Sequence, residues 1–336
     1  MIETRRGGVL GLAVVALFVV GALVPAAAVG PPAGGCVWTA SLLPLPEGAF
    51  DGMVTAGAGT WFAGVADGMD GVRWHDGRVE RLGQAFGLDT TLHGINANGE
   101  AVGSVAGADH RRHAVRYRGR GYEYLPETAG DSVALDVNAR GEIAGFDGAT
   151  LVVWPPDGPA RVLAMPPNAT AYGHPSIDDD GTVVARTGQL AGDAMRWQSY
   201  AWPPADEEGP AGGVGEPAGG TRLPVPVGEV RDIRHGQVVG ASIPPTGSAM
   251  GWALDGGRAR LYPGGVTAVA VNGAGLVVGA GSAGEPLLWD GFVPTVLPAP
   301  PGYFPGSVTA LTDREAGGFV SPDDDYGIVP VQWRCR

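Results

Sequence analysis

The sequence contains no lysine and has few charged residues overall. Its 22 cationic residues are all arginine, against 35 aspartate and glutamate residues, so the formal net charge is −13 over 336 residues. Proteins that bind nucleic acid neutralise its phosphates with clustered cations. The acidic balance therefore disfavours nucleic acid as a partner.

Recognisable catalytic and metal-binding signatures are also missing. The chain contains no G-x-S-x-G, H-E-x-x-H, P-loop or Cys-x-x-Cys pattern. His93, His174 and His235 fall near expected innermost strands and can approach a central axis, but no nucleophile stands beside them in the sequence. No catalytic residue is therefore assigned, and a non-enzymatic role is favoured.

Long hydrophobic runs are absent outside the first 28 residues. In that leader, Arg5 and Arg6 precede an apolar stretch over 9–24, and alanines at 26–28 form an A-x-A cleavage site. We expect 1–28 to be a signal peptide and the mature chain to be secreted without a membrane span. Export would use the Sec route, or the twin-arginine (Tat) route that the paired arginines resemble. A lipid anchor on Cys36 is the alternative.

Glycine and proline are abundant, at 58 and 29 residues, and they recur in register with short apolar segments. Seven copies of one pattern follow each other, each with about four short strands in a period of about forty residues, which is typical of a β-propeller. We predict an all-β, seven-bladed propeller with four-stranded blades over 29–336, with a flexible Pro/Gly-rich insert at 203–220. The aromatic anchors that end the third strands are Trp74, Tyr117, Trp154, Trp197, Trp252, Trp289 and Trp333.

An Asn or Asp followed by Gly marks the first turn of several copies. The side chain of such a residue bonds to backbone two residues further on, and the glycine adopts the positive φ that a tight hairpin requires. We therefore assign structural roles in turns to Asn96, Asn138, Asp178 and Asn272.

The two ends of the mature chain complement each other. The last copy stops after its third strand, at Trp333, whereas residues 41–46 (SLLPLP) match the fourth strand of a copy. We predict that this N-terminal strand completes the last blade and so removes an open sheet edge. Cys36 and Cys335 then fall where a turn joins these strands in the other copies, and in an exported protein they are expected to form a disulfide.

The pattern A-x-(D/G)-(I/V)-N-x-x-G-x-(V/A)-(V/A)-G, followed by a loop and a third strand, resembles the HAF family of extracellular repeats. The best match runs over 92–125, where His113-Ala114-Val115 stands for the triplet that names the family. The resemblance extends over most of the mature chain and is strong in the second, third and sixth copies. It implies a secreted, propeller-like protein and assigns no functional residue.

The loops between blades and those between second and third strands are expected on one face of the ring, which we call the loop face. Propellers commonly bind ligands through such variable loops. Aromatic residues in these loops can stack on sugar rings or grip a peptide. The candidate ligand-binding residues are Phe50, Phe86, Tyr172, Tyr303 and Phe304.

Two acidic loops indicate Ca²⁺ as a candidate cofactor. The first blade carries Asp67 and Asp70 in one loop, and the last blade carries Asp323, Asp324 and Asp325 in the adjacent one. Five carboxylates from neighbouring loops match the oxygen ligands that Ca²⁺ prefers. Two solvated acidic turns are the alternative, since neither loop matches a known Ca²⁺ motif.

The sequence therefore predicts a secreted, monomeric propeller that acts as a non-catalytic binding or scaffold module for an extracellular protein or glycan. The alternative is a secreted hydrolase or lyase with an axial active site. An enzyme is expected to have an open axial cavity in which His93 or His174 meets a carboxylate within hydrogen-bonding reach. A scaffold is expected to have a plugged or featureless channel.

Overall fold

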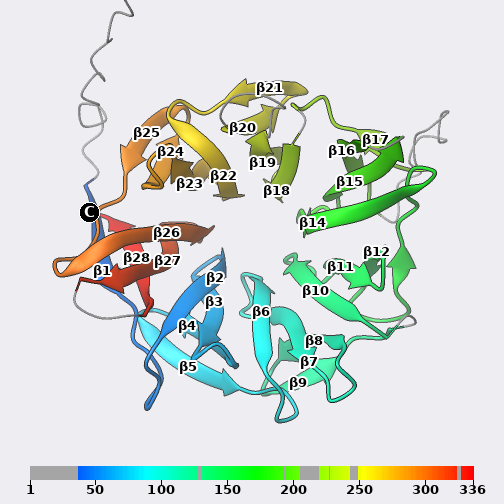
Figure 1. The fold of residues 1–336 in the computed structure, drawn as a ribbon. Helices are drawn as coiled ribbons and strands as arrows, with labels where there is room; N and C mark the ends of the chain where they lie inside the picture. The colour runs from blue at the N-terminus through cyan, green and yellow to red at the C-terminus, as the bar shows by residue number, and fades with distance from the viewer. Residues whose placement is uncertain are drawn as a thin grey trace, which may run out of the picture. The chain divides into compact units, whose positions relative to one another are not determined.

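The computed structural model describes residues 37–127, 130–191, 194–204, 219–226, 228–242, 249–323 and 327–336. These residues form seven four-stranded antiparallel sheets arranged as blades around an axis (Figure 1). The predicted seven-bladed β-propeller is confirmed. No helix long and apolar enough to cross a membrane occurs in these ranges.

Each blade runs from an innermost strand beside the axis to an outermost strand at the rim. The first blade contains β2 (Gly52–Ala58), β3 (Trp61–Ala66), β4 (Asp70–His75) and β5 (Arg78–Gly83). The second contains β6 (Thr90–Ile95), β7 (Ala101–Ala106), β8 (Arg112–Arg118) and β9 (Gly121–Tyr124). The third contains β10 (Ser132–Val137), β11 (Ile143–Asp147), β12 (Thr150–Trp154) and β13 (Arg161–Val162).

The remaining blades follow the same order. The fourth contains β14 (Ala169–Ile177), β15 (Val183–Ala191), β16 (Ala194–Trp202) and β17 (Thr221–Arg222). The fifth contains β18 (Gly228–Arg234), β19 (Gln237–Ser242), β20 (Met250–Asp255) and β21 (Arg258–Leu261). The sixth contains β22 (Gly265–Val271), β23 (Leu276–Gly281), β24 (Pro286–Asp290) and β25 (Val293–Val296). The seventh contains β26 (Tyr303–Leu311), β27 (Glu315–Pro322), β28 (Val329–Cys335) and β1 (Trp38–Leu42).

Tryptophans at the ends of third strands form the core between neighbouring blades. In five blades the indole is almost fully buried, and its N–H donates to a backbone carbonyl in the segment that leads into the blade, so the ring is anchored at both ends. The Trp252 indole of blade five is equally buried, but its N–H has no hydrogen-bond partner among the described residues. The blade-four anchor is Trp202, not the predicted Trp197. Because β16 has nine residues, Trp197 lies mid-strand and packs under the Arg186 guanidinium. The bonds are Trp74 to Pro44 (2.7 Å), Trp154 to Pro126 (2.6 Å), Trp202 to Ala164 (2.9 Å), Trp289 to Pro263 (3.1 Å) and Trp333 to Pro298 (2.7 Å).

The predicted Asn and Asp turns are confirmed, and they also join blades. The Asn96 amide oxygen accepts the N–H groups of Asn98 (3.0 Å) and Glu100 (3.1 Å), which closes the turn. Its amide nitrogen donates to the Asn138 carbonyl in the next blade (3.0 Å). The same link recurs from Asn138 to Asp178 and from Asn272 to Thr312, at 3.0 Å each.

The ring closes as expected, with shifted strand bounds. Strand β1 pairs with β28 in antiparallel register, Trp38 opposite Cys335 and Leu42 opposite Val331. The predicted closing strand over 41–46 was therefore placed too late. The pairing uses 38–42, and the chain leaves the sheet at Leu43, whose N–H donates to the Pro330 carbonyl at 2.9 Å. The leader 1–28 and most of the insert, 205–218, lie outside the described residues.

Candidate functional site

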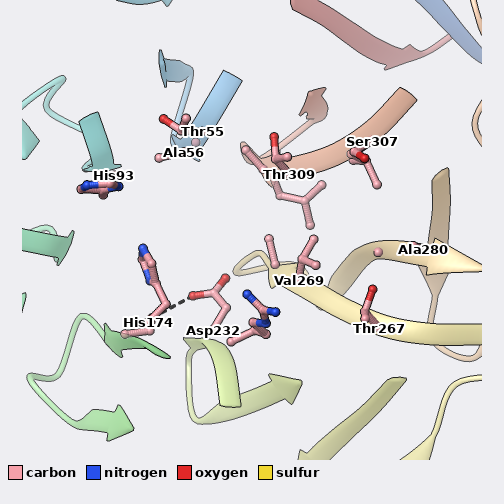
Figure 2. Close-up of a pocket in the computed structure, with 18 of the residues that line it drawn as sticks. Thr55, Ala56, His93, His174, Asp232, Thr267, Val269, Ala280, Ser307 and Thr309 are labelled. Carbon is pink, nitrogen blue, oxygen red and sulfur yellow. Dashed lines mark hydrogen bonds between the residues drawn. The ribbon is translucent and has the colours of Figure 1, made fainter. Parts of the chain in front are cut away.

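A cavity of about 430 Å³ lies on the axis, and every innermost strand contributes to its wall. Gly284 and Pro286, from the turn between β23 and β24, also line it, so it is on the loop face. Figure 2 shows His93, His174 and Asp232 on one side of the space, and Thr309, Val269 and Ala280 on the other. This volume is within the range of small-molecule sites.

A β-bulge in each innermost strand determines which side chains reach the axis. The ladder of β6 skips from Leu92 to Gly94, so His93 is the extra residue and points into the cavity (Figure 2). A bulge re-aims a side chain and increases local twist. The equivalent residues are Thr55, Leu135, Arg231, Val269 and Thr309, and in blade four the irregularity spans 173–175.

The residue after the bulge joins blades three to six through side chains. In blades three, four and five it carries an oxygen that accepts a backbone N–H of the following blade, so the free edges of the innermost strands are bridged. We call these contacts acceptor ties. They are Asp136 to the Ile177 N–H (2.9 Å), Ser176 to the Ile233 N–H (3.4 Å) and Asp232 to the Val271 N–H (2.9 Å).

Two carboxylates and one arginine are buried together at these ties. The Arg234 guanidinium contacts both oxygens of Asp136 at 3.4 Å and lies 3.6 Å from Asp232. The Ser176 hydroxyl is 2.6 Å from Asp136 and 2.9 Å from Asp232. Because a hydroxyl has a single proton, Ser176 donates to one carboxylate, and the second contact is satisfied when Asp232 is protonated and donates to it.

Burial raises the pKa of Asp232 to about 6, and the neighbouring Asp136 charge adds to this, while Arg234 opposes it. Burial also acts to raise the pKa of Asp136. There the Arg234 charge and the hydrogen bonds from Ser176 and Ile177 prevail and leave that pKa below its ordinary value. The two carboxyl groups therefore differ: one stays ionised, and the other changes charge near pH 6.

Both histidines named from the sequence line the cavity, as expected. Their rings lie edge to face with centroids 6.3 Å apart. Burial, with the charges of His174 and Arg112, lowers the pKa of His93 to about 4. Burial also lowers the pKa of His174, against the opposing charges of Asp136 and Glu229. Both rings are therefore neutral at pH 7.

The cavity has neither the histidine–carboxylate hydrogen bond expected of an enzyme nor the plugged or featureless channel expected of a scaffold. Among the described residues, no hydrogen bond joins His93 or His174 to a carboxylate, and His93 Nε2 lies 3.5 Å from the Ser104 hydroxyl. The channel is nevertheless not featureless. A second hollow of about 110 Å³ lies on the opposite face, lined by His235 among others. Arg234, Gly57 and Leu311 line both hollows.

The other half of the wall is built from small and hydroxyl-bearing residues. In blades seven and one, a threonine at the bulge donates to a carbonyl of the following blade: Thr309 to Val54 (2.7 Å) and Thr55 to Leu92 (2.8 Å). The next residue is Ala270, Ala310 or Ala56 in blades six, seven and one, and all three line the cavity. The space therefore exists because these positions carry no larger side chain.

The predicted aromatic residues lie outside the cavity lining. Phe50 is 90% exposed, and Phe86 stacks on Tyr124 with ring centroids 4.1 Å apart. Tyr172 packs edge-on against Trp197, and Tyr303 packs on the core of the seventh blade. Phe304 is 58% exposed. The three phenylalanines are therefore available to solvent, whereas the two tyrosines support the fold.

Three of the five predicted calcium ligands are described. Asp67 Oδ1 accepts the N–H groups of Phe50 (2.8 Å) and Asp51 (3.2 Å), and Asp70 pairs with Arg81 at 2.9 Å. The N–H of Asp323 donates to the Gly302 carbonyl. Asp324 and Asp325 lie outside the described residues, and the rest contain no cluster of three or more metal-ligating side chains.

The predicted disulfide also involves a residue outside the described ranges, Cys36. The nearest described backbone is paired: Val37 and Arg336 exchange hydrogen bonds of 3.0 and 3.1 Å, and Trp38 is opposite Cys335. The disulfide stays a prediction.

Sequence reasoning missed most of the cavity wall. In four copies a signal was present in the residue two positions before the turn Asn or Asp, which varies while the residue after it stays apolar. It is Gly94, Asp136, Ser176 or Ala270, and Ala56, Asp232 and Ala310 hold the same position in copies whose turn begins with another residue type. The polar members of this series are Asp136, Ser176 and Asp232.

No family model and no curated protein matches the chain. Solved structures with a similar backbone fold include YjhT, which has 12% sequence identity, a TM-score of 0.37 and an alignment that covers 86% of this chain and 99% of the other. A proposed oxidoreductase (glucose dehydrogenase) from Thermus thermophilus has 12% identity over 89% and 100%, with a TM-score of 0.40. The N-terminal domain of Nup159 has 11% identity over 87% and 79%, with a TM-score of 0.30.

Proposed function

We propose that this propeller is a secreted, non-catalytic binding module that holds the end of an extracellular glycan in its axial cavity. The observation that carries the proposal is the composition of the wall. Carboxylate, imidazole and guanidinium groups occupy one arc, and threonine and serine hydroxyls stand beside small aliphatic residues in the other. A pyranose ring presents matching groups, with hydroxyls at its edge and C–H groups on its faces.

Exposed aromatic residues support a longer ligand than one sugar. Phe50 and Phe86 are solvent-exposed in segments that lead into innermost strands, and Phe304 is solvent-exposed near the start of β26. Such rings can stack on further saccharide units outside the cavity. A small anchoring pocket combined with exposed aromatic residues suits the terminus of a chain better than a flat protein surface.

Export agrees with this partner. The leader and the HAF-like repeats favour secretion, and a disulfide between Cys36 and Cys335 would then hold closed a ring whose last blade is completed by β1. Reduction under native conditions is expected to lower the melting temperature of the exported protein, and a Cys335→Ser variant is expected to lose this sensitivity. An unchanged melting temperature on reduction would contradict the pairing.

One observation favours an axial hydrolase or lyase as a second candidate. Asp232 lines the cavity and has a pKa near 6. A carboxyl that changes protonation close to the working pH is suited to general acid catalysis. Incubation of glycans that bind, followed by mass spectrometry, separates the two functions: products shorter than the ligand would support catalysis.

The direct test is a glycan array probed with the purified protein and two matched variants. Ala280 lines the cavity (Figure 2), whereas Ala274 is exposed in the β22–β23 turn on the opposite face. Ala280→Phe is expected to abolish binding because the ring occupies the cavity, and Ala274→Phe is expected to leave it unchanged. Equal binding by both variants, with unchanged melting temperatures, would place the ligand elsewhere and contradict the proposal.

A further inference from the structure

On the basis of the proposed function, we infer that the sugar held in the cavity carries a carboxylate, bound by Arg231 and by backbone N–H groups of β2, β6 and β26. This names the ligand class as a uronic-acid-type sugar. Three independent features of the wall support it: the direction of the backbone donors, the state of Arg231 and the charge balance of the buried acids.

The backbone donors follow from strand register. In β26 the Thr312 N–H bonds to the Glu315 carbonyl, so the preceding residue, Leu311, directs its N–H away from β27 and toward the free edge. In β6 the bond from Asn96 to Glu100 orients the Ile95 N–H in the same way. Gly57 is the equivalent residue of β2. All three residues line the cavity.

The acceptor ties show which hydrogen-bond acceptors are missing beside the N–H groups of β2, β6 and β26. In blades four, five and six, the equivalent N–H groups of Ile177, Ile233 and Val271 meet a side-chain oxygen of the preceding blade. For Leu311, Gly57 and Ile95, the preceding blade carries Ala270, Ala310 and Ala56 instead. A methyl group accepts no hydrogen bond, so this half of the cavity presents donors where the other half presents satisfied pairs. An incoming carboxylate supplies the missing acceptor.

Arg231 adds a cationic donor. It is the bulged residue of β18 and lines the cavity. One of its terminal nitrogens, Nη2, pairs with Glu229 at 2.8 Å. Its Nε is buried and has no hydrogen-bond partner among the described residues. Guanidinium groups bind carboxylates through paired N–H donors, which makes an acid group the natural complement.

The charge of the site depends on Asp232. Around it lie Asp136, Glu229, Arg231 and Arg234, while the imidazoles of His93 and His174 are neutral at pH 7 and β22 contributes only uncharged residues. Protonation of Asp232 removes one negative charge from this cluster. An anionic ligand therefore binds more tightly below pH 6 than above it.

Calorimetric titration with glucuronate and glucose tests the inference, because these sugars differ by a carboxylate in place of a hydroxymethyl group. Glucuronate is expected to bind at least about tenfold more tightly than glucose. Its affinity is expected to rise by about tenfold from pH 8 to pH 5, the effect of a one-unit pKa coupling. Asp232→Asn is expected to remove this pH dependence.

Arg231→Gln is expected to weaken glucuronate binding by about tenfold or more and to leave glucose unaffected. Arg258→Gln, on the exposed strand β21, is the matched control and is expected to behave as wild type. Melting curves report whether Arg231→Gln is folded, and the comparison of the two sugars on wild-type protein does not depend on any variant.

The outcomes separate this inference from the proposed function. If sugars bind in a manner sensitive to Ala280→Phe, but without preference for the carboxylate or for Arg231, the carboxylate assignment is wrong and the glycan site stands. If Ala280→Phe changes nothing, the site itself is wrong. If glucuronate binding survives Arg231→Gln while its preference over glucose persists, Arg231 is not the cationic contact.

Discussion

The two halves of the channel wall have the same backbone and opposite side chains. Blades three to five direct Asp136, Ser176 and Asp232 at the next blade, and Arg234 fills the space among them. Blades six, seven and one carry Ala270, Ala310 and Ala56 at that position and leave a cavity. A bulge precedes the position in both halves.

The comparison shows that the residue after the bulge decides whether a blade forms an acceptor tie to its neighbour or leaves space for a ligand. Where the side chain reaches the neighbouring innermost strand, the polar edge is satisfied internally and the channel is filled. Where it is a methyl group, the edge stays available, and a threonine at the bulge joins the blades instead through Thr309 and Thr55. A repeat protein can therefore place a ligand site without changing its blade geometry.

The largest loss of stability is expected when Asp136 is removed from the buried cluster of blades three to five. Asp136→Ala removes the acceptor of the Ile177 N–H and leaves buried Arg234 with Asp232, at 3.6 Å, as its one carboxylate partner beside two backbone carbonyls. Loss of one partner of a buried ion pair destabilises a protein by about 3–5 kcal/mol. Urea denaturation of the variant checks this value, and a loss below about 1 kcal/mol would show that the cluster is not a stabilising tie.

The second effect concerns pH. Because the folded-state pKa of Asp232 is raised from 3.8 to about 6, the folded protein binds its proton more tightly than the unfolded chain. This contribution is fully present below about pH 4 and is lost as pH rises through 6. The shift corresponds to about 3 kcal/mol. The lowered pKa values of His93 and His174 act with the opposite sign and raise stability with pH in both proteins. The stability of wild type relative to Asp232→Asn is therefore expected to fall by about 3 kcal/mol between pH 4 and 7, and parallel curves for the two proteins would contradict it.

A smaller loss of stability is expected from a substitution in blades six, seven and one. Thr309→Val keeps the side-chain shape and removes the hydrogen bond to the Val54 carbonyl, which costs about 1 kcal/mol. Thermal or urea unfolding checks the loss. Thr221→Val, on the exposed strand β17, serves as the control and is expected to be neutral. A neutral Thr309→Val variant would show that the threonine links do not join these blades.

The smallest change in stability is expected when a new side-chain acceptor is introduced in blade seven. Ala310→Ser places in blade seven the residue that blade four uses, where the Ser176 oxygen accepts the Ile233 N–H. The serine is expected to accept the Gly57 N–H and to stabilise the fold by about 0.5–1 kcal/mol. Unfolding curves measure the gain. Destabilisation would show that the donor is not directed at this position.

The repeat predicted the ring and its closure but misplaced two details. Trp202 anchors blade four where Trp197 was predicted, because the longer hairpin of that blade shifts its register, and the length of a hairpin is not visible in the anchor spacing. The closing strand uses 38–42 rather than 41–46, because pairing with β28 continues to the chain end. Both errors are local.

The candidate site was predicted less completely than the fold. His93, His174 and His235 were correctly expected near the axis. The aromatic residues of the loops were chosen for their position between strands, yet none of these five lines the cavity in the described structure. The cavity wall comes from the strands themselves, and the bulge that directs residues such as Arg231 inward has no distinct sequence signal.

The sequence by itself determined the number of blades, the Asn turns within them and the use of an N-terminal strand to close the ring, since each depends on local pattern and chain order. Only the tertiary structure decided which residues face the axis. Asp136, Asp232 and Arg234 meet across as many as 98 residues because the innermost strands of blades three and five, β10 and β18, converge there. Such a cluster depends on burial and on contacts between blades, which no single repeat contains.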